Sequence, residues 1–454
     1  MGCGGTLRSV IRTALAAVVL STAVAHAGGL VLPVGGVRSL QRAGALVAGA
    51  EDADSLWLNP AGLAVLRGDG KRALLFDAAY VYQTVDYAPL DATGMPAPAA
   101  TNLQPGHAIP QLAGAYAIGD RLVLAGGVSA PYDAVHRYAA DGPQRFASLD
   151  TSGSQYFVVS FGAGYAVNDQ LRIGITAQNW VSRRFDQIVT RACTQATCDP
   201  ADASLDMRLD LAQTDYFAPG GALGLQYSIS PQIGFGAVVQ SPVRISGTGD
   251  LTVHLPTAMQ FSAATVSGKH AGLAYTLPPS ARIGLEVRPR KGLRIEAALA
   301  VELWSVPGAT TITPDHVQLD NVTGGPYPLG EIEVAHHGTT SFAPAIAVEW
   351  HPKDMMFGAG YSYETSATEA RDVSVASIDA AKHVIGLGGG YDADGWQIGA
   401  AVGIALLADV EVAPGDARVL QQTPLRDPRT TVPINAGRYE STYFVAGLRF
   451  ARRL

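Results

Sequence analysis

The sequence predicts an all-β fold, a transmembrane antiparallel β-barrel of fourteen strands. A unit consisting of an alternating apolar strand, a tight polar turn and a second alternating strand recurs six times along the chain. The connections between predicted strands are short and long in turn, as in bacterial barrels with short periplasmic turns and long extracellular loops. Charged residues form only 16% of the chain, and no apolar run of about 18 residues, the length of a membrane helix, follows the N-terminal region.

The six polar turns occupy residues 118–121, 167–170, 228–231, 288–291, 351–354 and 392–395. Five of them follow an aromatic residue at nearly the same offset, namely Tyr116, Tyr165, Tyr227, Trp350 and Tyr391. Amphipathic rings at one level of a closed sheet are typical of a membrane interface, so these residues predict a lower aromatic girdle. Trp180, Trp304 and Tyr363, near the opposite strand ends, are predicted to form the upper girdle, with ligand contact as the alternative.

Period-two alternation, followed outward from the turns, defines the fourteen strands. They are predicted at residues 71–84, 106–118, 121–130, 153–167, 170–184, 214–228, 231–245, 278–288, 291–305, 339–351, 353–365, 381–392, 395–408 and 438–450. The count is even, as is usual for bacterial barrels made from one chain.

The alternation also predicts which side chains face the lumen. Arg282, Glu286, Arg294 and Glu296 fall on the inner face, so we expect a charged lumen. Several inner positions are glycine, at Gly162, Gly164, Gly224, Gly386, Gly388 and Gly390. These glycines either leave room for another part of the chain or relieve crowding where the strands coil.

The N-terminal region divides into two parts before the barrel, which is predicted over residues 71–454. Residues 1–27 read as a signal peptide, because Arg8 and Arg12 precede an apolar run that ends in small residues, with cleavage after Ala25 or Ala27. Residues 28–70 lack sustained alternation. A barrel of fourteen strands is too wide for its own side chains to fill, so this part is predicted to be a hatch that plugs the lumen.

Two cysteines, Cys193 and Cys198, lie close together in a polar loop. In an exported protein they predict a local disulfide. A metal site is the alternative, but no histidine lies nearby to complete one, and neither a metal nor a cofactor is predicted. The net charge of −7 does not suggest nucleic acid as a partner.

Several motifs resemble the FadL/TodX family of outer-membrane transporters of long-chain fatty acids and other hydrophobic compounds. Residues 42–48 (RAGALVA), 51–58 (EDADSLWL) and 59–64 (NPAGLA) are similar to the hatch of that family, with Asp52, Asp54, Asn59, Pro60, Ala61 and Gly62 as its signature. Resemblance continues at 277–284, at Trp304 and Ser305, and at 361–364 and 378–383. It therefore covers the hatch and much of the C-terminal half.

The resemblance implies a barrel plugged by its hatch in the outer membrane of a Gram-negative cell. A hydrophobic ligand would pass from the extracellular loops into a pocket against the hatch and leave through a lateral opening in the third strand. Here that strand contains Gly126, Gly127 and Pro131, a candidate for interrupted pairing, with an ordinary strand end at Pro131 as the alternative. Ile188 stands near the position of the family's ligand-binding arginine, and Phe450 precedes four further residues instead of ending the chain.

Hatch residues supply a candidate apolar path, since exposing hydrocarbon to water costs about 0.8 kcal/mol per methylene group. The candidates are Leu30, Leu32, Val37, Leu40, Leu46, Leu56 and Trp57, and packing of the plug against the wall is the alternative. Asn59 is expected to cap or turn the chain before Pro60. Asp52 and Asp54 are expected to bond backbone N–H groups or to pair with lumen arginines such as Arg282 or Arg294.

These features predict a monomeric transporter of hydrophobic small molecules, surrounded by outer-membrane lipid, with no catalytic residues. A general diffusion porin and an outer-membrane hydrolase are the alternatives. An Asp-His pair, Asp315 with His316, and a His-His pair, His336 with His337, fall in one long loop, but no serine motif accompanies them. The identity of the cargo, whether fatty acid, aromatic hydrocarbon or another lipid, stays open.

Overall fold

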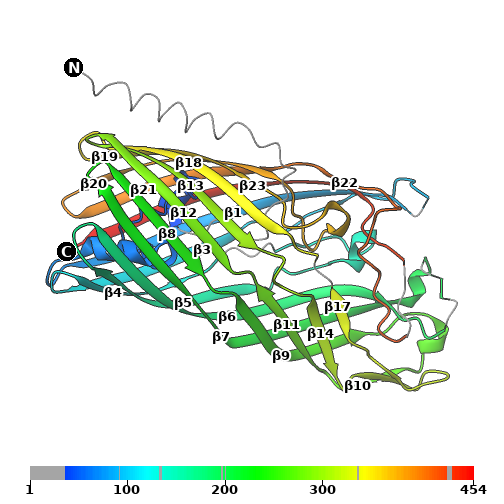
Figure 1. Ribbon diagram of the computed structural model, residues 1–454. Helices are drawn as coiled ribbons and strands as arrows, with labels where there is room; N and C mark the ends of the chain where they lie inside the picture. Colours follow the sequence, from blue (N-terminus) through cyan, green and yellow to red (C-terminus); the bar gives the residue numbers. More distant parts are fainter. Residues whose placement is uncertain are drawn as a thin grey trace.

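A closed antiparallel sheet forms the wall of the protein in the computed structural model, which describes residues 36–91, 93–131, 135–195, 198–199, 201–334, 337–426 and 432–454 (Figure 1). Fourteen strands make up the closed wall in these ranges: β1 (Arg72–Pro89), β3 (His107–Ile118), β4 (Leu122–Ser129), β5 (Gln155–Ala166), β6 (Leu171–Arg191), β7 (Asp206–Ser230), β8 (Ile233–Gln240), β12 (Ser280–Arg290), β13 (Leu293–Leu303), β18 (Thr340–Trp350), β19 (Met355–Glu364), β20 (Lys382–Ala393), β21 (Trp396–Leu407) and β23 (Gly437–Arg453). β1 pairs with β23 from Ala73↔Arg453 to Pro89↔Gly437, which closes the barrel. Each of the fourteen predicted strands overlaps one of these, so the fold prediction is confirmed.

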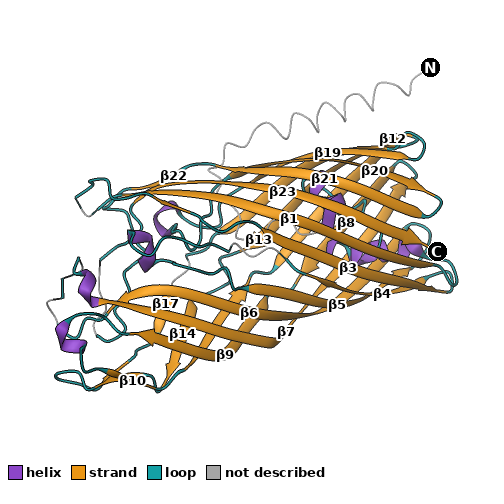
Figure 2. Cartoon of the chain, turned by 180° about the vertical axis from the view of Figure 1, so that it is seen from behind, coloured by secondary structure: helices purple, strands orange, loops and turns teal. Residues whose placement is uncertain are grey.

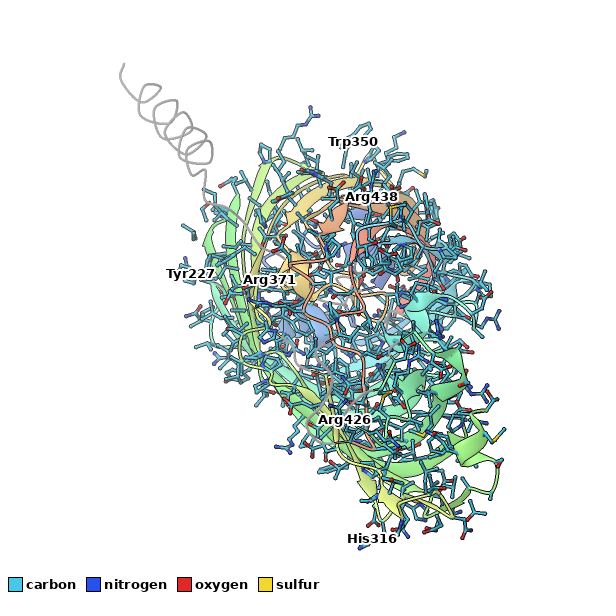
Figure 3. All side chains as sticks on the ribbon, turned by 90° about the vertical axis from the view of Figure 1, so that its right-hand side faces the viewer. Tyr227, His316, Trp350, Arg371, Arg426 and Arg438 are labelled. Carbon is cyan, nitrogen blue, oxygen red and sulfur yellow. A yellow bond between two sulfur atoms is a disulfide. The ribbon has the colours of Figure 1, made fainter. Side chains whose placement is uncertain are left out.

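The outer face of the wall is apolar, as alternation predicted. Large exposed hydrophobic side chains include Leu112, Phe161, Ile175, Leu223 and Val402. All five aromatic residues beside the short turns are exposed, and Figure 3 shows Tyr227 and Trp350 at the outside of the barrel. A sheet that closes on itself has no free edge and satisfies its backbone hydrogen bonds, which is what a hydrocarbon environment requires.

One side of the sheet continues beyond the barrel into a lobe. β9 (Val243–His254), β11 (His270–Leu277), β14 (Thr310–Asp315) and β17 (Ile332–Val334) extend it beside the long ends of β6 and β7. Apolar residues of β7, among them Met207, Leu209 and Leu211, form the core of this lobe, and His316 lies at its far tip (Figure 3). The single strand predicted at 231–245 is wrong, because β8 ends at Gln240 and β9 begins at Val243, with the donor-less Pro242 between them.

The remaining elements are short. β10 (Thr265–Ser267), β15 (Gln318–Asp320) and β16 (Tyr327–Pro328) form a separate small sheet, while β2 (Ala100–Thr101) and β22 (Val410–Val412) add to the main one. The 3₁₀ turns are η2 (Pro143–Phe146), η3 (Ala203–Leu205), η4 (Met259–Phe261) and η5 (Ala370–Asp372). Among the described residues, no helix is both long enough and apolar enough to cross a membrane.

Residues 36–66, here called the luminal segment, lie inside the barrel (Figure 2). They contain α2 (Gly36–Gln41), α3 (Ser55–Leu58) and η1 (Pro60–Leu66). Inward glycines make room for them: a methyl group on Gly162 would meet Leu56, and one on Gly224 would meet Asn59. Gly164, Gly386 and Gly388 likewise face the segment, whereas Gly390 faces its neighbouring strand. The predicted signal peptide, Leu30 and Leu32 lie outside the described residues, and the boundaries 28–70 stay a prediction.

Candidate functional site

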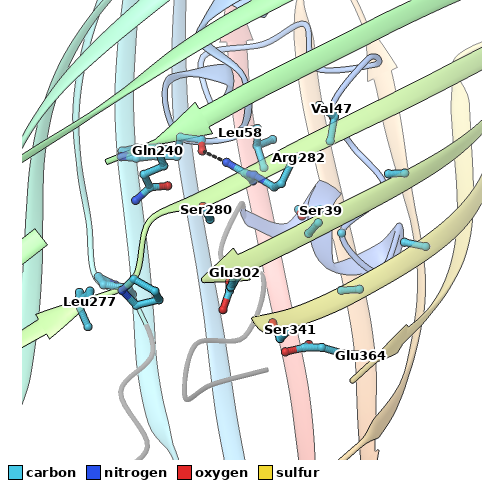
Figure 4. Close-up of a pocket in the computed structure, with 18 of the residues that line it drawn as sticks. Ser39, Val47, Leu58, Gln240, Leu277, Ser280, Arg282, Glu302, Ser341 and Glu364 are labelled. Carbon is cyan, nitrogen blue, oxygen red and sulfur yellow. Dashed lines mark hydrogen bonds between the residues drawn. The ribbon is translucent and has the colours of Figure 1, made fainter. Parts of the chain in front are cut away.

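A cavity of about 190 Å³ lies between the luminal segment and the barrel wall (Figure 4). The segment contributes Val47, Trp57 and Leu58 to its lining. Opposite them are residues from ten strands, including Trp180, Ala298, Arg282, Glu302, Ser341 and Glu364. Apolar side chains thus form the body of the cavity, with a few charged groups at defined places, which is the usual composition of a small-molecule site.

Two tryptophans predicted for the upper girdle face the lumen instead. Trp180 is only 8% exposed and both tryptophans line the cavity, so the girdle prediction is wrong for both, and the alternative of ligand contact stays a prediction. The physical reason is parity: Leu303 takes the outward position in β13, which places the next residue, Trp304, on the inner side. The indole N–H of Trp304 donates to Glu302 at 2.8 Å.

Arg282 is the cation of the cavity lining. Its guanidinium donates to the backbone carbonyl of Trp57 at 3.1 Å, which joins β12 to the luminal segment (Figure 4). The predicted inward position of Arg282 is therefore confirmed. Asp52 and Asp54 do pair with a lumen arginine, as predicted, but the named candidates Arg282 and Arg294 are wrong, because both aspartates lie around a different arginine.

That arginine is Arg449 of β23. It forms ion pairs with Asp52 and Asp54 of the luminal segment at 3.0 Å each, and with Asp77 of β1 at 3.1 Å. All four side chains are at most 3% exposed. Arg453 adds a second contact to Asp52 at 3.2 Å. A buried carboxylate needs such a partner, since an unpaired buried charge costs several kcal/mol.

A second ionic cluster holds the other half of the segment. Arg42 reaches Glu296 at 2.8 Å and Glu349 at 3.2 Å, with all three side chains fully buried. Arg38 also pairs with Glu349, at 2.9 Å. Arg294 joins Glu51 to Glu286, so the four lumen charges predicted from alternation are confirmed as inward groups.

Backbone N–H groups of the segment complete this cluster. Glu296 accepts hydrogen bonds from Val47 at 2.7 Å, Ala48 at 2.8 Å and Gly49 at 3.0 Å. On the opposite wall, the amide of Gln226 donates to the carbonyls of Val47, Ala48 and Ala50. The irregular backbone over residues 47–50 is thus satisfied by side chains of the barrel, as a buried non-helical stretch requires.

The hatch signature seats the segment against β6 and β7. Asn59 caps η1 by accepting from the N–H of Ala61, as predicted, and its amide donates to Val47 and to Leu225 of β7. Pro60 and Ala61 pass so close to Gly174 that a methyl group there would lie 2.2 Å from the Pro60 backbone. Gly62 faces the carbonyl of Ala50, where a methyl group would lie 2.4 Å away.

Among the residues of the predicted apolar path that the structure describes, only Trp57 lines the cavity. Leu56 packs on the wall beside Leu75, and Leu46 packs within the segment against Ala50 and Leu58. Val37 and Leu40 lie against inward glycines of the wall. These four residues therefore pack the segment against its surroundings, which was the alternative. The short inward side chains of the strands leave space that the segment fills.

The third strand of the wall, β4, does not have interrupted pairing at its two glycines. Gly126 and Gly127 pair in register with β3 and with β5, and both ladders continue to Ser129. The strand ends there, and Ser129 and Pro131 line the cavity. The prediction of a break at Gly126 and Gly127 is therefore wrong, and the alternative of a strand end at Pro131 describes the structure.

The remaining sequence predictions concern cysteines and histidines outside the lumen. Cys193 and Cys198 form the predicted disulfide. His316 bonds only its neighbour Asp315 among the described residues, and His337 bonds Asp372, while His336 lies outside them. Within the described ranges, no three His, Cys, Asp or Glu side chains converge in a way that could hold a metal ion.

Comparisons with known proteins agree with this architecture. The family model described as "Outer membrane protein transport protein (OMPP1/FadL/TodX)" matches residues 18–432. Similar solved structures are a Pseudomonas aeruginosa FadL homologue (TM-score 0.75, 16% identity, 94% of this chain and 99% of that one), the Ralstonia pickettii toluene transporter TbuX (0.64, 16%, 93% and 99%) and the P. putida toluene transporter TodX (0.64, 15%, 93% and 99%). None of the curated proteins matches the chain.

Proposed function

We infer the function from the premise that this chain belongs to the outer membrane protein transport family OMPP1/FadL/TodX. It is a transporter of hydrophobic compounds, and it lies in the outer membrane of a Gram-negative cell. Its wall closes within one chain, which supports a monomer. The apolar outer face supports direct contact with membrane lipid.

The cavity against the luminal segment is the observation that carries a finer proposal, that the cargo is a compact hydrophobic compound. A volume of about 190 Å³ is close to that of an apolar protein cavity of roughly 150 Å³ that accepts benzene. A single ring fits this space, whereas an extended acyl chain would leave most of its length outside. Two of the similar solved structures are toluene transporters, which supports the same class of cargo.

The route out of the cavity follows from what surrounds it. Below, the ionic clusters hold the luminal segment in the bore, so straight passage needs that segment to move. At the side, β4 stops at Ser129, whereas β3 continues to His107 and β5 continues to Gln155. Since Ser129 and Pro131 line the cavity, we propose a lateral exit above the end of β4. The cargo would then enter the lipid without crossing water.

A general diffusion porin would need an open bore, and the luminal segment argues against it. Conductance in planar bilayers separates these functions. We expect the intact protein to show little steady ion conductance, and a large conductance would favour the porin. No contact described above favours the hydrolase.

Uptake of labelled toluene by proteoliposomes tests the transport site directly. Ala298→Trp places an indole in the cavity, and we expect it to reduce uptake to near the level of empty vesicles. Ala297→Trp is the matched control, because Ala297 is the neighbouring outward residue of the same strand. Equal uptake by the two variants would show that cargo does not use this cavity.

A further inference from the structure

Two opposite charges line the cavity without pairing with each other. Arg282 and Glu302 belong to the adjacent strands β12 and β13, where Ser280 is opposite Glu302 and Arg282 is opposite Ala300. They are therefore diagonal neighbours on the inner face, within reach of one another across the sheet. Among the described residues, the hydrogen bonds of Arg282 go only to the Trp57 carbonyl, and Glu302 accepts only from Trp304.

Each of these groups keeps unused hydrogen-bonding capacity. A guanidinium has five N–H donors and a carboxylate has about four acceptor positions. Arg282 and Glu302 are only half-buried because the cavity is open beside them. A group placed between them could accept from the arginine and donate to the carboxylate at the same time.

We propose that the cavity selects compact ring compounds that carry a neutral hydroxyl group, bound between Arg282 and Glu302. This inference rests on the proposed function and names the chemical class of its cargo. A hydroxyl is both a donor and an acceptor, so one oxygen satisfies both side chains. A plain hydrocarbon would cover them and leave their remaining donor and acceptor positions unfilled, which is unfavourable once water is displaced.

Charged ligands fit this lining less well. A carboxylate would meet Arg282 but would also face Glu302 and Glu364, the two acidic groups of the same cavity. Glu364 is paired with Lys382 at 3.1 Å, and Lys382 also lies 3.5 Å from Asp379, so this lysine is already shared. An ammonium group would meet Glu302 but would be repelled by Arg282. The neutral hydroxyl is the group that both charges favour.

Binding of three probes of one shape tests the proposal: p-cresol with a hydroxyl, toluene with none, and 4-methylbenzoate with a carboxylate. Titration of the purified protein in detergent at pH 8.5 should show p-cresol binding about tenfold more tightly than toluene, as expected for one hydrogen bond to a charged group. We expect 4-methylbenzoate to bind more weakly than p-cresol. Because the probes also enter micelles, the preference is compared between wild type and variants.

Glu302→Gln keeps the shape of the side chain and an acceptor for Trp304, and we expect it to cut the preference for p-cresol several-fold. Arg282→Met should have the same effect, and Glu302→Gln carries the test if the arginine variant does not fold. Glu440→Gln, at an exposed site outside the lining, is the matched control and should keep the wild-type preference. An equal affinity for p-cresol and toluene, an unchanged preference in Glu302→Gln, or tightest binding of 4-methylbenzoate would each overturn the proposal. Absence of binding by all three probes would instead contradict the proposed cargo class itself.

Discussion

Arg449 of the last strand donates a hydrogen bond to Asp54 of the luminal segment at 3.0 Å, and both side chains are 1% exposed. The same guanidinium reaches Asp77 of the first strand. One side chain thus connects the closure of the barrel, where β1 meets β23, to the position of the segment in the bore. The closure of the wall and the docked segment therefore share one buried charge.

Removing that charge should release the segment. In Arg449→Met, three buried carboxylates lose their main partner, and breaking such a pair costs about 3–5 kcal/mol. We expect a lower thermal midpoint in detergent and a measurable ion conductance in planar bilayers. Arg438→Met is the control, since Arg438 is a half-exposed residue of the same strand whose ion pairs are with exposed carboxylates. If Arg449→Met conducts no more than this control, the segment does not depend on the arginine.

The contacts of Glu296 predict a more local effect. Glu296→Gln replaces an acceptor oxygen by an N–H donor that faces the backbone N–H groups of residues 47–49. An unsatisfied buried group costs about 1–3 kcal/mol, so these amides should exchange with solvent roughly ten- to a hundredfold faster. Hydrogen exchange followed by mass spectrometry measures this. Glu440→Gln, at an exposed site, should leave the same amides unchanged, and protection equal to wild type in both variants would contradict the role of Glu296.

The glycine that faces the hatch signature allows a steric test. A methyl group in Gly174→Ala would lie 2.2 Å from the Pro60 backbone, and overpacking of this kind costs about 1–3 kcal/mol. We expect the segment to become sensitive to added protease while the barrel stays folded. Gly234→Ala on β8 is the matched control, because nothing lies within 4 Å of its added methyl group. Equal protease resistance would mean that the close approach at Gly174 is not needed for docking.

The sequence predicted the wall better than its contents, and the reason is physical. Alternation repeats along every strand, so the inward charges Arg282, Glu286, Arg294 and Glu296 could be assigned from parity alone. Partners across the bore follow no such rule. Asp52 and Asp54 meet a lumen arginine, as predicted, but it is neither Arg282 nor Arg294. The partner is Arg449, distant in sequence and brought near only when the barrel closes.

Parity also explains what was missed. Arg449 stands between the outward residues Leu448 and Phe450, so its inward position could have been predicted from the last strand. Trp180 and Trp304 were assigned to a girdle by their level along the strands, although their side chains point to the lumen. Tryptophan is typical of membrane interfaces, and the prediction rested on that residue type. The direction of the side chain, which parity gives, is what distinguishes a lipid contact from a ligand contact.

Acidity should change the docking of the luminal segment through Asp54. Burial, the largest cause, and the neighbouring Asp52 raise the pKa of Asp54 to about 6 from its ordinary 3.8, although Arg449 opposes the shift. The docked state therefore binds this proton more tightly than the released state. The stabilisation of the docked state by this proton is fully present below pH 3.8 and is lost as the pH rises through 6. Glu51 and Asp52 have lowered pKa values, so they stay ionised across this range.

Hydrogen exchange of residues 45–50, corrected for the intrinsic effect of pH on amide exchange, measures this contribution between pH 4.5 and 7.5. In the wild-type protein, we expect protection to fall as the pH rises through 6. Asp54→Asn cannot ionise at this position, so its protection should change less over the same range. The same slope in both proteins would show that Asp54 does not control docking, because its proton would then be bound equally well with the segment docked or released. The opposite slope in the wild type would also contradict the prediction, because the released segment would then bind the proton more tightly.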